Sequence, residues 1–212
     1  MHPEGCHPCF SSSLASSEMI FRRLAPRDLP GLLELQEFNH FENLTPDQQK
    51  EGFLSARFSA EQFAQMNREA AVVIAEAEGR VVGYACSAGL DFSRQFPILD
   101  AMIATFGRLT YLGTTLIDTR VCVYGPVCVD RAWRGRGVLR GLITRLKEEL
   151  AGQFDMAAAF IAKTNSRSLA AHVDGLGMTV LGDYAFEAGR YWIVAFGIPP
   201  DDLACGIGPR QS

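Results

Sequence analysis

The stretch Val127-Cys128-Val129-Asp130-Arg131-Ala132-Trp133-Arg134-Gly135-Arg136-Gly137-Val138-Leu139-Arg140 decides the fold. It passes from a β-branched run through a short loop into the start of a helix. Two glycines at this turn permit backbone conformations closed to other residues, so consecutive N–H groups can point toward one place. Those groups are also the unpaired donors of a helix N-terminus, which favours an anion. We predict a phosphate site formed by Arg134, Gly135, Arg136, Gly137, Val138, Leu139 and Arg140.

Charge is concentrated at this turn. Four arginines fall between Arg131 and Arg140, whereas the whole chain has 20 Lys and Arg against 24 Asp and Glu and a net charge of −4. Guanidinium groups beside a glycine-rich helix start suit a pyrophosphate. The acidic balance gives no reason to expect nucleic-acid binding. An ordinary solvated turn, whose arginines serve solubility, is the alternative.

Two commoner phosphate motifs are absent from the sequence. There is no G-x-x-x-x-G-K-[ST], and no G-x-G-x-x-G with an acidic residue after the next strand. Neither a nucleoside triphosphatase nor a dinucleotide oxidoreductase is supported. Coenzyme A is the remaining candidate ligand.

Outward from this stretch, hydrophobic periodicity, caps and turn residues predict one α/β domain over residues 19–198, with loose tails at 1–18 and 199–212. Pro46 after Thr45, and Gln62 three residues after Ser59, are helix-start patterns, and Gly125-Pro126 should bend the strand that contains them. The predicted strands are 19–24, 71–75, 81–88, 119–129, 156–161, 178–181 and 190–196. The predicted helices begin near residues 26, 46 and 60 and span 92–112, 138–150 and 165–174.

Composition limits the remaining classes. The chain has 212 residues, 48% of them hydrophobic, which suffices for one substantial core. No run approaches the roughly 20 apolar residues that span a bilayer, and no signal-peptide pattern opens the chain, so we expect a cytoplasmic protein without a membrane partner. We expect Cys86, Cys122 and Cys128 to be small buried hydrophobes. Cys6 and Cys9 form an isolated C-x-x-C, a weak signal for zinc or redox chemistry, and we predict no metal site.

The residues from Arg134 to Leu139 resemble the acyl-CoA signature of the GNAT superfamily of N-acetyltransferases, Arg/Gln-x-x-Gly-x-Gly/Ala, and the likeness extends over roughly residues 19–198. The resemblance implies a mixed, mostly antiparallel sheet with a splayed central strand, helices on both faces, acetyl-CoA as cofactor and direct transfer to an amine. In such proteins the splayed strand binds the pantetheine arm, and its counterparts here are Val127, Cys128 and Val129. Leu139 departs from the signature, which ends in Gly or Ala.

A second resemblance lies in Asn165-Ser166-Arg167-Ser168-Leu169-Ala170-Ala171-His172 followed by Gly175-Leu176-Gly177-Met178. It is similar to the family's Asn-x-x-Ser/Ala helix, which implies that Asn165 and Ser168 lie beside the pantetheine. His172 stands where a tyrosine often protonates the leaving thiolate. An imidazole can donate a proton near neutral pH, and a packing role is the alternative.

Direct transfer also needs a polarised thioester carbonyl and a group that takes the amine proton. The N–H of Val129 is the candidate for the first task. For proton transfer the sequence offers His172, Tyr124 and Glu42, with Glu37 and His40 in the same region after the first helix. Cys128 could act as an acyl-accepting nucleophile, but a packed side chain is the favoured interpretation, since no histidine is near it in sequence.

The acceptor is the least determined part. Residues 92–112 form an apolar insertion that either covers an acceptor pocket or packs in the core or a homodimer interface. We expect a small-molecule amine or amino acid as acceptor. The alternative function is a non-catalytic acyl-CoA-binding or sensing module, which keeps the phosphate site and lacks a proton-transfer set.

Overall fold

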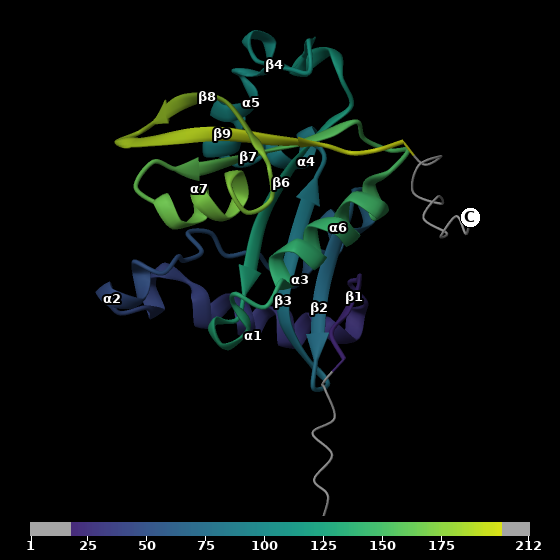
Figure 1. Cartoon of the computed structure of the whole chain (residues 1–212), viewed down its shortest axis with the longest axis vertical. Coiled ribbons are helices and arrows are strands. Elements are labelled where there is room, and N and C mark those ends of the chain that lie inside the picture. Colours follow the sequence, from purple (N-terminus) through teal and green to yellow (C-terminus); the bar gives the residue numbers. More distant parts are fainter. Residues whose placement is uncertain (1–17, 201–212) are drawn as a thin grey trace, which may run out of the picture.

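The computed structural model describes residues 18–200, which contain a seven-stranded sheet in the order β1-β2-β3-β6-β7-β9-β8 (Figure 1). All neighbouring strands are antiparallel except β6 and β7. The predicted mixed, mostly antiparallel α/β sheet is therefore confirmed. The strands are β1 (Ile20–Arg23), β2 (Ala71–Ala77), β3 (Arg80–Ala88), β6 (Val121–Val129), β7 (Met156–Ala162), β8 (Thr179–Phe186) and β9 (Gly189–Gly197).

Helices cover both faces of this sheet. Alternate residues of β2 contact different helices: Val72 and Ile74 pack with α1 and α3, whereas Val73 and Ala75 pack with α6. Figure 1 shows α6 in front of β2 and β3, and α7 in front of β7. The helices are α1 (Leu29–Asn39), α2 (Pro46–Gln49), α3 (Ala60–Glu69), α4 (Leu90–Ser93), α5 (Pro97–Ile103), α6 (Val138–Leu150) and α7 (Ser166–Val173).

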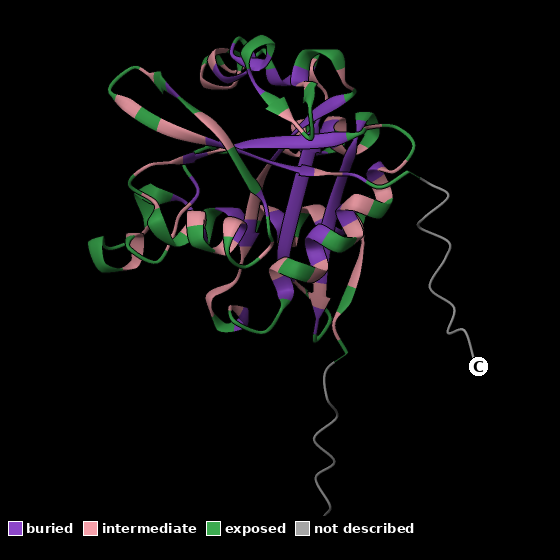
Figure 2. Cartoon of the chain, turned by 45° about the horizontal axis from the view of Figure 1, so that its top comes forward, coloured by how far each residue is buried: buried purple, intermediate pink, exposed green. Residues whose placement is uncertain are grey.

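Short elements link these parts. They comprise five 3-10 turns and a small two-stranded sheet among the described residues: η1 (Pro26–Asp28), η2 (Phe41–Asn43), η3 (Phe106–Arg108), η4 (Leu116–Asp118), η5 (Arg131–Trp133), β4 (Thr110–Tyr111) and β5 (Thr114–Thr115). Burial is deepest along the central strands, as the purple ribbon in Figure 2 shows. The predicted domain limits 19–198 stay a prediction, and Cys6 and Cys9 lie outside the described residues.

Both predicted helix-start patterns form capping boxes. The Gln48 N–H donates to Thr45 Oγ1 at 3.3 Å and the Thr45 N–H to Gln48 Oε1 at 2.9 Å. Ser59 and Gln62 exchange the equivalent bonds at the start of α3. These local interactions satisfy backbone donors that a helix N-terminus leaves free, which is why sequence alone locates them.

The single helix predicted over residues 92–112 is wrong. Pro97 instead begins a separate helix, α5, because proline disfavours helical geometry at the residue before it, and Phe96 is extended at φ −107° and ψ 115°. The insertion folds as α4, α5, η3 and β4 in succession. Its apolar residues Met102, Ile103 and Phe106 are buried against β7, β8 and β9. The core interpretation of these side chains is therefore correct.

The central strand β6 bends at Gly125-Pro126, as predicted. Ala85 of β3 pairs with Val127 and Ser87 with Tyr124, so two residues of β6 oppose one of β3. This bulge inverts the side-chain alternation: Tyr124 packs on the α6 face, whereas Cys128 packs on the α1 and α3 face. Beyond the bulge, β6 separates from β7.

The separation is visible in the register. β6 and β7 pair only over Val121–Val123 and Met156–Ala158, although both strands continue for several residues. In Figure 1 the two strands diverge from this short seam. The opening between them is the space that the functional site occupies.

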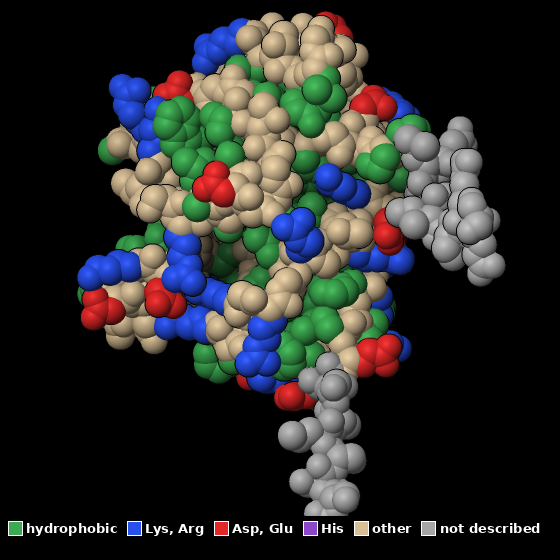
Figure 3. Space-filling model, viewed as in Figure 1, with side chains coloured by type: hydrophobic (Ala, Val, Ile, Leu, Met, Phe, Trp, Pro, Cys, Tyr) green, Lys and Arg blue, Asp and Glu red, His purple; other side chains and the backbone are tan. Residues whose placement is uncertain are grey.

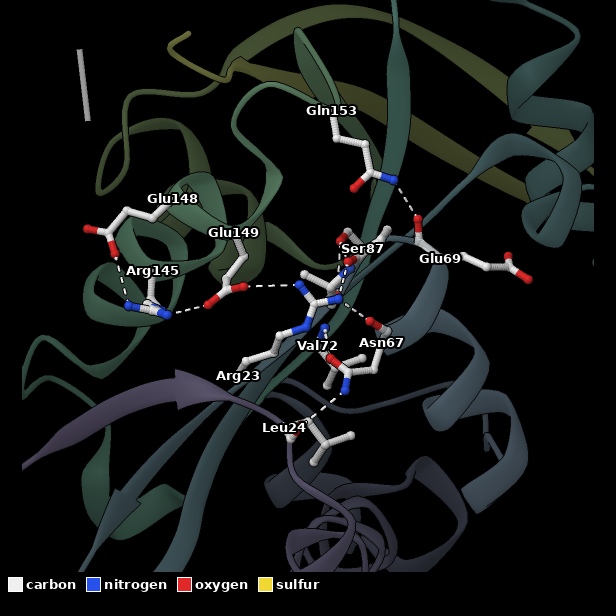
Figure 4. A network of polar contacts seen from close by, with 12 residues as sticks. Arg23, Leu24, Asn67, Glu69, Val72, Ser87, Arg145, Glu148, Glu149 and Gln153 are labelled. Carbon is white, nitrogen blue, oxygen red and sulfur yellow. Dashed lines mark hydrogen bonds and ion pairs between the residues drawn. The ribbon is translucent and has the colours of Figure 1, made fainter. Parts of the chain in front are cut away.

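A polar network joins the end of β1 to the C-terminal ends of α3 and α6. Arg23, at the end of β1, donates to the backbone oxygens of Asn67 and Ala70 and pairs with Glu149 of α6 at 3.0 Å (Figure 4). Gln153 donates to the Glu69 carbonyl at 2.6 Å. These contacts satisfy the last carbonyls of α3, which no intrahelical donor reaches.

Candidate active site

A cavity of about 570 Å³ lies in the opening between β6 and α7. Figure 3 shows a hollow in this region, with Lys and Arg side chains gathered around it. Its walls come from four parts of the chain. They are Val127, Cys128 and Val129 of β6; Trp133, Arg134, Gly135, Gly137, Val138, Leu139 and Arg140 at the start of α6; Asn165, Arg167, Ser168, Ala171, His172, Gly175 and Leu176 in and around α7; and Asn39, Glu51, Gly52, Phe53 and Leu54 between α1 and α3.

The backbone of β6 forms the floor. The Asp130 N–H donates to the Val82 carbonyl of β3 at 2.9 Å. Because antiparallel pairs alternate in hydrogen bonding, the N–H and C=O groups of Val127 and Val129 are directed away from β3, toward the opening that β7 leaves. The Val129 C=O accepts from Arg134 Nε at 3.0 Å, whereas the two N–H groups and the Val127 C=O face the opening, where an extended ligand arm could bind.

The start of α6 forms one end of the cavity. Gly135 and Gly137 have φ of +74° and +80°. No side chain caps the helix, and the first intrahelical backbone bond at this end runs from the Gly141 N–H to the Gly137 carbonyl at 3.0 Å. A Cβ atom added at either glycine would meet nothing within 4 Å. Free amides that face open space at a helix N-terminus fit the diphosphate of coenzyme A.

Leu139 lies between the core and the cavity. The side chain is partly buried and packs against the core cluster around α6 while it also lines the cavity. The departure from the family signature at this position is thus accommodated by the core. The backbone amides of the helix start are unaffected.

The arginines of the signature have different surroundings. Arg134 Nε donates to the Val129 carbonyl at 3.0 Å, its Nη1 to the Glu51 carbonyl at 2.9 Å and its Nη2 to Asn39 Oδ1 at 3.2 Å. All three of its nitrogens therefore bind protein oxygens. Arg140 lines the cavity and donates to the Gly175 carbonyl at 2.7 Å. Arg136 lies over the Trp133 ring at 5.1 Å and is not among the lining residues.

Tyr124 lies behind His172: His172 lines the cavity, whereas Tyr124 is buried and is not among the lining residues. Tyr124 Oη and His172 Nε2 are 3.1 Å apart, and both side chains are buried. His172 Nδ1 lies 2.7 Å from the Ser168 carbonyl oxygen, which can only accept, so Nδ1 carries a proton. In a neutral imidazole Nε2 then accepts the Tyr124 hydroxyl proton. Burial lowers the pKa of His172 and raises the pKa of Tyr124, which favours this neutral pair.

Asn165 and Ser168 fix the first turn of α7. The Ser168 N–H donates to Asn165 Oδ1 at 3.0 Å, so Asn165 caps the helix. Both residues line the cavity, and their contact with the pantetheine arm stays a prediction. The cap also places the Ser168 carbonyl one helical turn before His172.

Cys128 does not have the properties of a nucleophile. Burial raises the pKa of its thiol to about 12, and the nearby Arg134 offsets this only in part. Reactive cysteines have a depressed pKa. The packing interpretation of this residue is therefore the better supported one.

The three candidates predicted after the first helix, of which Glu37 lies in the last turns of α1, are all outside the cavity lining. Glu37 and Glu42 are exposed and both pair with Arg57, at 3.0 and 2.6 Å. His40 is buried, and its Nδ1 accepts from the Glu42 N–H at 3.3 Å. The predicted role of Glu42 in proton transfer gains no geometric support.

The cavity wall formed by Asn39 and residues 51–54 was not predicted, since these residues belong to no motif. Arg167 was not predicted either, because it occupies a variable position of the Asn-x-x-Ser/Ala pattern. Asn39 ends α1 and accepts from Arg134, so only the three-dimensional path of the chain brings this wall to β6. In the described residues no cluster of His, Cys, Asp and Glu could hold a metal ion. None of the described helices is long and apolar enough to cross a membrane.

Comparison with known proteins identifies the family. The family model described as "Acetyltransferase (GNAT) family" matches residues 32–178. A comparison with curated protein sequences gave no match. The fold is similar to an N-acetyltransferase from Staphylococcus aureus Mu50, with 17% identity over 86% of this chain and 100% of that chain and a TM-score of 0.57.

Two further solved structures share the fold. One is yncA from Salmonella typhimurium, solved with its cofactor acetyl-CoA, at 17% identity over 92% of this chain and 99% of that chain, with a TM-score of 0.54. The other is a ribosomal-protein-alanine N-acetyltransferase from Brucella melitensis, at 23% identity over 84% and 99%, with a TM-score of 0.54. The family match spans more than half of the 212 residues, so the chain belongs to the GNAT family and is an acetyltransferase that uses acetyl-CoA and an amine acceptor.

Proposed function

We propose that the protein transfers an acetyl group from acetyl-CoA directly to the amine of a small molecule or amino acid. One observation carries the proposal: a single cavity contains the free edge of β6, the uncapped start of α6 and the His172 side chain that binds Tyr124. Together these supply a site for an extended thioester and a path for a proton.

Binding uses mostly backbone groups. The amides from Gly135 to Arg140, with the Arg140 guanidinium, would hold the diphosphate. The free edge of Val127 and Val129 would hold the pantetheine, with Asn165 and Ser168 opposite. Acetyl-CoA, when bound, supplies the thioester carbon that the amine attacks. The Val129 N–H would donate to the carbonyl oxygen, where negative charge develops.

His172 and Tyr124 would return a proton to the leaving sulfur. As the C–N bond forms and the C–S bond breaks, the attacking nitrogen gives up one proton, which would pass to His172 Nε2 and on to the Tyr124 oxygen while the Tyr124 hydroxyl proton moves to the thiolate. One proton is transferred in total, and Tyr124 stays neutral throughout. The high pKa that burial gives Tyr124 favours this relay over ionisation of the phenol.

A small acceptor suits the shape of the site. Residues 51–54 face α7 across the cavity, and Glu51 approaches Arg167 of α7 to 3.8 Å. The approach of these two side chains narrows the mouth through which an acceptor would enter the cavity from the solvent. In a homodimer, Leu112 of the insertion and Ile117 after it would be the apolar contacts, since they are exposed whereas most other apolar side chains of the insertion are buried or partly buried. The free thiols of Cys86, Cys122 and Cys128 suit a reducing compartment such as the cytoplasm.

The test follows thiol release from acetyl-CoA over a panel of amines. Two matched variants separate cofactor binding from folding: Gly137→Asn and Gly79→Asn. Both glycines have positive φ, +80° and +73°, and a Cβ atom at either would lie in open space, but Gly79 lies in the β2–β3 turn. Asn tolerates this φ, so both variants should fold.

We expect the wild type and Gly79→Asn to release thiol with at least one amine. In Gly137→Asn the new side chain enters the space of the diphosphate, and affinity for coenzyme A should fall at least tenfold. Equal affinity of all three proteins for coenzyme A would refute the assignment of the α6 start as the diphosphate site. Tight binding by the wild type without release for any acceptor would favour the sensing module.

A further inference from the structure

Among the described residues that line the cavity, Glu51 is the one carboxylate. An aliphatic amine is protonated in water near neutral pH, with a pKa of about 10 for a lysine-like group. Such an acceptor arrives as a cation at a cavity surrounded by arginines. A single carboxylate in the wall then determines where the cation can bind.

The carboxylate of Glu51 is free of hydrogen bonds within the described residues. The closest cation is Arg167 Nη1 on α7, 3.8 Å from Glu51 Oε2, beyond hydrogen-bond distance. Both side chains are about half exposed, at 51% and 54%. Exposed pairs of this kind are weak, so a ligand ammonium can replace Arg167 at little cost.

Other charged groups around Glu51 have partners. Arg134 donates to the Glu51 backbone oxygen at 2.9 Å, which fixes the main chain at this position. Lys50, the preceding residue, pairs with Asp47 at 2.8 Å. Arg167 is therefore the cation that an incoming ammonium has to displace.

We propose that Glu51 recruits the acceptor as an ammonium ion and makes the enzyme selective for aliphatic primary amines. This inference rests on the proposed function and assigns the acceptor-binding residue of the same site. The ammonium takes the place of Arg167 beside the carboxylate and is thereby held inside the cavity, next to β6. The ammonium gives one proton to solvent water at this half-exposed position, and the neutral amine then attacks.

The experiment measures KM for both substrates in Glu51→Gln and in Asp100→Asn. Asp100 is a matched control because it pairs with Arg94 and is also 51% exposed, but it lies on α5, away from the cavity lining. The acceptors are a primary aliphatic amine and its fluorinated analogue of similar size, whose pKa lies below the assay pH. A tertiary amine of the same carbon skeleton, which cannot be acetylated, serves as inhibitor.

Glu51→Gln should raise KM for the aliphatic amine about threefold, the size of effect expected for an ion pair on a half-exposed carboxylate. KM for acetyl-CoA and for the fluorinated amine should stay unchanged. Inhibition by the tertiary amine should weaken by a similar factor, and Glu51→Asp should restore part of the affinity. Asp100→Asn should resemble the wild type.

Three results would overturn the inference. In the first, Glu51→Gln affects charged and neutral acceptors equally; in the second, it acts only on KM for acetyl-CoA. In the third, Glu42→Gln shows the charge-selective loss instead. Each leaves thiol release by the wild type intact, whereas the absence of release in the wild type would refute the proposed function itself.

Discussion

Arg134 opens the family signature, yet its geometry assigns it to the protein rather than to the cofactor. Replacement by Met keeps most of the length of the side chain and removes every donor. Two of the lost bonds, to the Val129 carbonyl and to Asn39 Oδ1, are partly buried. At about 1.5 kcal/mol for each such charged bond, the loss is about 3 kcal/mol.

The third bond, to the Glu51 carbonyl, is exposed, and water replaces it at little cost. For each charged hydrogen bond we take the lower end of the usual energy range, because burial lowers the pKa of Arg134 and thus indicates that the folded chain desolvates this cation. We therefore expect the free energy of unfolding in urea to fall by about 3 kcal/mol. The matched variant Arg136→Met should change it by less than about 1 kcal/mol, since Arg136 only overlies the Trp133 ring.

Affinity for coenzyme A tests the role of Arg134 separately from stability. If Arg134→Met unfolded at the wild-type urea concentration but bound coenzyme A far more weakly, the Arg134 guanidinium would be a phosphate ligand. A structural role for Arg134 would then be refuted. Binding by the folded Arg134→Met protein within a few-fold of the wild type is the expected result.

Two further predictions concern buried groups. Burial lowers the pKa of His172, so the unfolded chain binds a proton at this histidine more readily than the folded chain does. The free energy of unfolding is therefore unaffected by this group above about pH 6.5. It falls as the pH drops below that value, by up to about 1.4 kcal/mol per pH unit. Urea unfolding at pH 7.5 and 5.5 should show this loss in the wild type and a smaller one in His172→Gln, and equal losses would contradict it. Tyr84 has a buried hydroxyl without a hydrogen-bond partner among the described residues, so Tyr84→Phe should stabilise the fold by about 1 kcal/mol. A destabilised Tyr84→Phe protein would indicate a partner for that hydroxyl.

The sequence predicted those parts that depend on neighbours along the chain. The helix starts at Pro46 and Ala60 were predicted from capping boxes. The uncapped start of α6 was predicted from two glycines before an amphipathic run. The bend in β6 follows from Gly125-Pro126. In each case a few adjacent residues decide whether specific backbone N–H groups are hydrogen-bonded or left unpaired. The types of these residues are therefore enough to predict the local structure.

Other parts depend on contacts between distant residues. Tyr124 and His172 are 48 positions apart and meet because the bulge turns Tyr124 to the α6 face, where α7 lies. Glu51 reaches the cavity because Arg134 binds its carbonyl from 83 positions away. β8 extends to Phe186, well beyond the predicted limit of residue 181, because pairing with β9 overrides weak local preference. No pattern in one sequence encodes such pairings.

The short seam between β6 and β7 divides the sheet into two antiparallel blocks, β1-β2-β3-β6 and β7-β9-β8. Backbone pairing between the blocks is limited to three residue pairs, and side-chain contacts such as Tyr124 against Phe196 complete the junction. The cofactor cavity belongs to neither block and exists only when the two are docked. A ligand that spans the junction therefore favours the docked arrangement by mass action, and acetyl-CoA becomes a component of the stability of the fold as well as a reactant.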